Sequence, residues 1–368
     1  MGTGLHGDTT AGGKPHFAVL DGLRGTAALL VVIFHIQGIT VLFEGSKVVL
    51  HHAPLAVDFF FMMSGFVIGY AYDDRWPGMT VRRFLGLRLA RLHPLLVLGM
   101  ILGLVSYLAD PFAGDTQSAP GGMIALAFVL GVFALPSLPL ANRWTDTHPL
   151  NGPAWTLFQE YLGNVLYALI LRHLSVRALG MVAGVAALAL VAGGAWGGTL
   201  DAGSYWETAH MALIRLVFPF VTGLLLFRLR ASLPRIRMGF LPLSLILLGA
   251  FLLPIAPPIA GFKVNGVAEA LAVIVLFPLI VIAGAHSDVG VGAQRLAHWA
   301  GKLSYPLYIT HYPFLYLYMN LVLVQKASPQ VVLLAGVGAV PLTLGVAALA
   351  VRWWDAPIRS RLAGWLAR

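Results

Sequence analysis

The chain has 368 residues, of which 58% are hydrophobic and 11% charged, and it contains no cysteine. This composition is far more apolar than that of a soluble protein, so it predicts a polytopic membrane protein and excludes disulfides and cysteine-based metal or nucleophile sites. The net charge of +9 comes mainly from Lys and Arg beside apolar segments, which indicates topology and contact with anionic lipid rather than nucleic-acid binding.

Apolar stretches of roughly membrane-spanning length recur along the chain. They cover residues 18–43, 55–72, 92–108, 121–138, 153–171, 178–198, 210–228, 239–256, 266–285, 304–323 and 330–352. The first stretch has no signal-peptide cleavage pattern, so it is expected to remain as an anchor.

Arginine-rich loops at 73–91, 172–177 and 227–238 are predicted to be cytoplasmic, whereas the loops at 109–120 and 199–208 contain acidic residues and no Lys or Arg. Two apolar segments then separate an outer loop from an inner one. One of them, for which we favour 121–138, should therefore not cross the membrane, and is expected either to be re-entrant or to lie in the interface. The predicted fold is an all-α, polytopic membrane helical bundle of about ten transmembrane helices plus one re-entrant segment, with both termini in the cytoplasm.

The same pattern gives the domain organisation, because no polar stretch is long enough to fold as a second domain. We expect a flexible cytoplasmic N-terminus at 1–17, one membrane domain at 18–355 and a basic cytoplasmic tail at 356–368.

The most informative stretch is LDGLRGTAALLVVIFHI, which carries Arg24 and His35 eleven residues apart. Eleven steps of about 100° return both side chains to within roughly 20° of one helix face, and the rise separates them by roughly 16 Å. Ionisable groups in a spanning helix usually face a polar cavity or a pathway. The pair therefore predicts a functional site, with Arg24 near the membrane surface and His35 near the middle.

Two further motifs follow in chain order. In VDFFFMMSGFVIGY, Asp58 is either an acid near the site or a helix-end aspartate, and Ser64 with its glycine neighbour favours close helix packing. In RRFLGLRLARLHP, Arg88 and Arg91 lie on one helix face at the mouth of a span. Planar, permanently charged guanidinium groups suit phosphate, so a phosphorylated cytoplasmic ligand is indicated; topology and lipid anchoring are the alternative.

The later motifs place polar groups inside apolar segments. In NGPAWTLFQEYLGNVLY, Glu160 needs a partner or a polar cavity, while Trp155 on its own is typical of an interfacial or packing aromatic. In GKLSYPLYITHYPF, Tyr305, Tyr308 and His311 recur every three residues, a spacing found both in packing stripes and in sites. There is no HExxH motif, P-loop or GxSxG elbow, so no metal site is predicted, and an ATPase or a serine hydrolase is not expected.

Together these motifs resemble the acyltransferase-3 family of integral membrane acyltransferases, whose members O-acylate polysaccharides, O-antigen and some small molecules. The resemblance runs from LDGLRG and His35 through FFFMMSGF, Arg88-Leu-Ala-Arg91 and Trp155-Thr-Leu to Leu303-Ser-Tyr. Thr156 stands where the family commonly has serine, and Gln159 where a second glutamate is common.

The resemblance implies an acyl-CoA donor, usually acetyl-CoA, on the cytoplasmic side of a bacterial inner membrane, and a glycan or glycolipid hydroxyl reached from the other side. Coenzyme A phosphates would bind at Arg24, Arg88 and Arg91. As a hypothesis, His35 is the general base, with Glu160 or Asp58 orienting its ring.

Candidate substrate-binding residues are Trp155, Tyr305 and His311. An acyl-histidine intermediate, a succinyl donor and a small glycoside acceptor remain open, as does the choice between monomer and homodimer. The rival from another class is a transporter, because intramembrane Arg, His and Glu also build substrate pathways, but no convincing internal repeat supports it.

Overall fold

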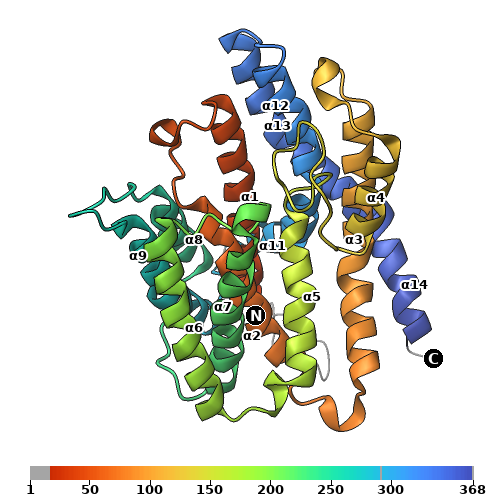
Figure 1. Ribbon diagram of the computed structural model, residues 1–368. Helices are drawn as coiled ribbons and strands as arrows, with labels where there is room; N and C mark the ends of the chain where they lie inside the picture. The colour runs from red at the N-terminus through yellow and green to blue at the C-terminus, as the bar shows by residue number, and fades with distance from the viewer. Residues whose placement is uncertain (1–16, 291, 367–368) are drawn as a thin grey trace, which may run out of the picture.

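The computed structural model describes residues 17–290 and 292–366, so the expected flexible terminus lies, except for Phe17, outside the described residues. Within the described ranges seven helices are long and apolar enough to cross a membrane, and shorter apolar helices accompany them. They form the predicted all-α polytopic bundle, in which most helices run along one common direction (Figure 1).

The helices are named in chain order as in Figure 1. They are α1 Ala18–Thr40, α2 Ala56–Tyr72, α3 Val81–Leu108, α4 Gly121–Val132, α5 Ala154–Leu169, α6 Val176–Gly197, α7 Ala209–Leu229, α8 Phe240–Leu252, α9 Val264–Leu271, α10 Phe277–Ala285, α11 Gln294–Thr310, α12 Tyr312–Leu323, α13 Pro329–Ala350 and α14 Ala356–Leu366. Two π-helical turns, Ala272–Leu276 and Val351–Asp355, join α9 to α10 and α13 to α14.

Helix α3 begins earlier than the sequence analysis predicted. The span was expected to begin at residue 92, after a loop, but the helix starts at Val81, where the Thr80 side chain accepts a hydrogen bond from the backbone N–H of Arg83. This N-cap satisfies one of the free amides of the first turn and fixes the start of the helix. Arg88 and Arg91 consequently lie within the helix, on a rigid element.

Helix α4 has the geometry of a re-entrant segment. Its 12 residues span only about 18 Å, whereas the hydrocarbon core is about 30 Å thick. The loops on either side of it meet at one residue, because Asn320 donates a hydrogen bond to Asp110 and accepts one from Asn142. The chain therefore enters and leaves α4 on the same side of the bundle.

The predicted segment 304–323 is not one continuous helix, because it is interrupted at His311 between α11 and α12. Pro313 cannot donate a hydrogen bond, and its ring excludes the carbonyl of Ile309 from normal helix pairing. That carbonyl instead accepts a hydrogen bond of 2.8 Å from the Asn151 side chain. The break places the His311 ring at the centre of the bundle.

The predicted sidedness of the loops agrees with their contacts. Arg228 donates hydrogen bonds to Asp73, to the carbonyl of Arg172 and to the carbonyl of Leu174, and so ties together the three arginine-rich loops. At the opposite end, Thr147 donates to Ser204, which joins the loop after α4 to the acidic loop 199–208. We call these the arginine-rich end and the outer end of the bundle.

Candidate active site

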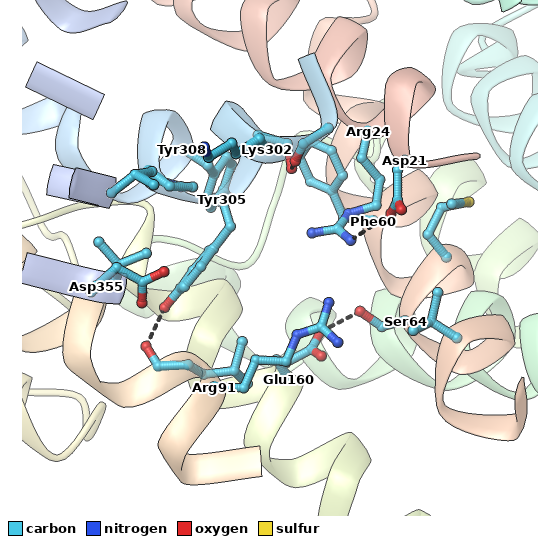
Figure 2. Close-up of a pocket in the computed structure, with 18 of the residues that line it drawn as sticks. Asp21, Arg24, Phe60, Ser64, Arg91, Glu160, Lys302, Tyr305, Tyr308 and Asp355 are labelled. Atoms are coloured by element: carbon cyan, nitrogen blue, oxygen red, sulfur yellow. Dashed lines mark hydrogen bonds and ion pairs between the residues drawn. The ribbon is translucent and has the colours of Figure 1, made fainter. Parts of the chain in front are cut away.

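A large cavity opens near the arginine-rich end of the bundle. Its volume is about 870 Å³, within the range of roughly 300–1,000 Å³ that is typical of ligand pockets. Residues from α1, α2, α3, α5, α11 and the α13–α14 junction line it and surround an open centre (Figure 2). Gln294 and His298 at the start of α11 form part of the wall. The loop that leads to α11 meets an arginine-rich loop, because His286 contacts the carbonyl of Arg230 at 3.1 Å.

The cavity brings together the three predicted phosphate-binding arginines, Arg24, Arg88 and Arg91, from α1 and α3. It also contains two cations that the sequence analysis missed, Lys302 from α11 and Arg359 from α14. These five cations outnumber the three lining carboxylates, Asp21, Glu160 and Asp355. The cavity is therefore suited to an anion.

Arg88 is held in place by neighbours on α5. Its Nη2 donates to Glu160 Oε1 at 2.8 Å, and its Nε donates to Asn164 Oδ1 at 2.9 Å. The other carboxylate oxygen of Glu160 accepts a hydrogen bond from Ser64 at 2.7 Å (Figure 2). Glu160 is thus the link between α2, α3 and α5 on this side of the cavity.

Two of the lining cations stand without a carboxylate. Arg24 is 3.4 Å from Asp21, and Arg359 is 3.1 Å from Asp355, but in the part of the chain that the structure describes Arg91 and Lys302 have no ion-pair partner. Arg91 also lies within the electrostatic field of Arg88, Arg24 and Arg359. Clustered like charges repel one another, and a bound anion would relieve that cost.

The inner wall of the cavity is aromatic. Tyr308 and Phe60 meet edge to face at 5.3 Å, and the Tyr308 hydroxyl accepts a hydrogen bond from Thr156 at 3.1 Å. Tyr305 also lines the cavity, as predicted, and its hydroxyl donates to the carbonyl of Leu92 at 2.6 Å. Behind this wall, the ring of His311 lies 6.1 Å from that of Tyr308.

The two histidines form a stacked pair beyond the aromatic wall. Their ring centroids are 5.6 Å apart with an angle of 26° between the planes. His311 is fully buried, and its Nδ1 lies 2.9 Å from the carbonyl of Tyr308 and 3.1 Å from that of Leu307. Because carbonyls only accept, we assign the proton to Nδ1. This leaves Nε2 with a lone pair and, among the residues that the structure describes, no hydrogen-bond partner.

His35 itself lines a second, much smaller cavity of about 10 Å³ on the outer side of the pair. Tyr312 meets it edge to face at 4.9 Å. Arg24 and His35 are predicted to lie on one helix face, and α1 does carry both, but they line different cavities.

Asp58 and Trp155, both predicted as site residues, are packed in the protein core around a buried ion pair. Asp58 is fully buried and accepts hydrogen bonds from Arg215, the shortest being 2.5 Å. Arg215 also donates to the carbonyls of Ala202 and Pro54, so the ion pair has further hydrogen bonds. Trp155 packs in the same core, with Arg215 5.7 Å from its ring. Within the described ranges, no group of three or more His, Asp or Glu is placed to hold a metal ion.

The comparisons with known proteins agree with one another on the kind of protein to which this chain is similar. A family model described as an acyltransferase domain matches residues 17–352. A Rhizobium radiobacter protein named Protein 2 in picA locus is 35% identical over 161 residues, which cover 41% of this chain and 81% of that protein. Acyltransferase MdmB from Streptomyces mycarofaciens is 33% identical over 183 residues, 46% of this chain and 43% of that protein. No solved structure matches the chain at a significant level.

Proposed function

The chain belongs to the acyltransferase-3 family and is a membrane acyltransferase, and on this premise we propose that it moves an acetyl group from cytoplasmic acetyl-CoA to a hydroxyl of a cell-envelope or exported glycan. The membrane is then the bacterial cytoplasmic membrane, with the arginine-rich end facing the compartment that supplies the thioester. The acceptor approaches from the other side.

The observation that carries this proposal is the cation-rich cavity at the arginine-rich end. Coenzyme A carries a pyrophosphate and a ribose phosphate, and guanidinium groups bind such oxyanions in bidentate fashion. Arg24, Arg88 and Arg91 are the proposed phosphate ligands, and Lys302 supplies a further cation. From there the pantetheine arm extends along the cavity towards Tyr308, so that the thioester meets the histidine pair.

The proposed chemistry is a direct acyl transfer. His35 takes the proton from the acceptor hydroxyl as its oxygen attacks the thioester carbonyl, so that a C–O bond forms and the C–S bond breaks. The same proton then passes to the coenzyme A thiolate, and the products are the ester and free coenzyme A. The free Nε2 lone pair of His311, stacked beside His35, makes it the neighbour best placed to assist the proton transfer.

The two acids have different roles in this proposal. Glu160 positions Arg88 and closes one side of the donor cavity, since its hydrogen bonds go to Arg88 and Ser64. The hypothesis that Glu160 or Asp58 orients the His35 ring is replaced, for Asp58, by a packing role in its ion pair with Arg215.

The test is release of free coenzyme A thiol. Membranes that contain the protein, acetyl-CoA and the host's envelope glycan fraction should release thiol and acetylate the glycan, and membranes without the protein should not. A transporter would release no thiol. Release from succinyl-CoA but not acetyl-CoA would move the proposal to a succinyl donor, and acylation of small glycosides alone would replace the glycan acceptor.

A further inference from the structure

The loops above His35 carry an exposed aromatic pair at the outer end of the bundle. Phe43 follows α1, and Trp144 lies in the loop after α4; their rings meet edge to face at 5.6 Å with an angle of 88°. Their exposed fractions are 48% and 42%. Both side chains also line the small cavity whose floor contains His35. The pair therefore covers the outer approach to the histidine.

The backbone holds these two aromatics in unusual conformations. Phe43 has a φ of 59° and Trp144 a φ of 44°, a left-handed region that bulky residues rarely adopt. Each loop is tied down locally. The amide of Phe43 donates to the carbonyl of Gly38 at 2.6 Å. Beside Trp144, Arg143 lies over the Tyr316 ring at 3.9 Å, and the Tyr316 hydroxyl donates to Asp146. The surroundings thus hold both rings over the cavity.

The size of the small cavity points to its occupant. At about 10 Å³ it has room for about one water-sized group. An alcohol hydroxyl is such a group, and a hydroxyl in this space would lie against His35, whose ring stacks on that of His311. The rest of an acceptor is too large for the space and has to remain at the aromatic pair.

The chemistry of the pair indicates which molecule carries that hydroxyl. One face of a sugar ring exposes polarised C–H groups, which complement the electron-rich face of an aromatic ring. We propose that Phe43 and Trp144 form an acceptor-binding cap, and that this cap takes a hydroxylated sugar ring from the outer face and directs one hydroxyl to His35. The inference rests on the proposed acyl transfer and adds to it the residues that bind the acceptor.

The cap also separates the two substrates. The large cavity is open to the arginine-rich end, whereas the thioester is shielded from the outer solvent by the His35–His311 pair and the closed cap. Excluding water from a reactive thioester suppresses its hydrolysis. Loss of a cap aromatic should therefore raise acetyl-CoA hydrolysis in the absence of an acceptor.

The first test measures access to position 35 and needs no acceptor. The chain has no cysteine, so His35→Cys introduces a single thiol in the full-length protein in sealed vesicles. We expect a small, membrane-impermeant methanethiosulfonate to modify it from the outer side, at least about tenfold faster when Trp144→Ala or Phe43→Ala opens the cap. The exposed outer aromatics Trp196 and Phe262 give the matched controls, Trp196→Ala and Phe262→Ala, which should leave the rate unchanged. Modification only from the arginine-rich side, or an equal rate in the cap variants, would overturn the proposal.

The second test addresses ring stacking in the protein with His35 intact. Transfer of labelled acetyl to the host's envelope glycan should fall by about tenfold in Trp144→Leu at low acceptor concentration and should be largely retained in Trp144→Phe, with the KM for acetyl-CoA unchanged in both. Equal transfer by the two variants would remove the stacking role. If the unaltered protein transfers no acetyl group at all, the proposed function fails, while the labelling experiment still decides whether the cap guards position 35.

Discussion

The cavity at the arginine-rich end and the outer cavity at His35 differ in volume, charge and the elements that line them. The cavity at the arginine-rich end is about 870 Å³ and is built from helix faces with five cations, whereas the outer one is about 10 Å³ and is covered by aromatic side chains from loops. A large, charged cavity suits a substrate recognised by its phosphates. A narrow aromatic one suits a substrate of which only a hydroxyl needs to enter.

Under the proposed function, this difference gives the two substrates separate entrances to one bundle. The cations lie on α1, α3, α11 and α14, and the ion pair between Arg88 and Glu160 fixes one wall. The outer cap depends instead on two loops. The histidine pair lies between these regions, and His35 lines the outer cavity.

Removing the imidazole of His35, which lies between the two cavities, should have the largest effect on activity. His35→Ala is expected to lower kcat for acetyl transfer by about 10²- to 10⁴-fold, the usual contribution of a general base, while the KM for acetyl-CoA stays unchanged. Thiol release from purified protein measures both. His210→Ala, an exposed histidine on α7, is the control. Full activity in His35→Ala would show that His35 is not the general base.

Asp58 lines neither cavity and forms a buried ion pair with Arg215. We expect it to contribute to the stability of the fold and not to catalysis. Asp58→Asn leaves Arg215 buried without its counter-charge, which typically costs about 3–5 kcal/mol, so the melting temperature in detergent should fall clearly. The KM for acetyl-CoA of the protein that remains folded should not change. Asp115→Asn in an exposed loop is the control. Unchanged melting together with lost activity would return Asp58 to the catalytic site.

The donor cavity should respond to loss of a single unpaired cation. Arg91→Gln removes a charge-assisted contact worth about 1.5–3 kcal/mol, so the KM for acetyl-CoA should rise about 10- to 100-fold with little change in kcat. Arg83→Gln, on the exposed side of the same helix, should leave the KM unchanged. Equal effects of the two substitutions would mean that the arginines act through lipid or topology.

The smallest predicted effect is a pH dependence of stability caused by Asp146, which lies in the same loop as Trp144. Burial raises the pKa of Asp146 to about 7, well above its usual range. The folded protein therefore binds a proton that the unfolded chain has released, so stability falls as the pH rises from about 4 through 7. Asp146→Asn should remove this dependence and melt at a higher temperature than the natural protein at pH 8 but not at pH 4. A melting difference that is the same at both pH values would contradict the account.

Much of the cation-rich cavity could be predicted from the sequence. Arg24 and Glu160 stand out as ionisable groups in apolar stretches, Arg88 and Arg91 stand out as an arginine pair at the mouth of a span, and all four line the same cavity. Lys302 gave no such signal, since it precedes the apolar part of its helix, and Arg359 looked like part of a solvated basic tail.

The outer region was far less predictable. Phe43 was predicted as the last residue of the first apolar stretch, but α1 ends at Thr40. Trp144 lies in a loop 101 residues later, and only the folded chain brings the two rings together. The interruption at His311 did have a signal, Pro313 two residues later, but the apolar run around it favoured a single span. For Asp58 the sequence left two alternatives open, an acid near the site and a helix-end aspartate, because its ion-pair partner, Arg215, lies 157 residues away in the chain.

The most direct measurement is a cryo-EM structure of the protein with coenzyme A bound. The phosphates should lie beside Arg24, Arg88 and Arg91, and the thiol end at the aromatic wall formed by Phe60 and Tyr308, facing the histidine pair. Phosphates bound away from these three arginines, or a thiol end directed away from His35, would contradict this prediction.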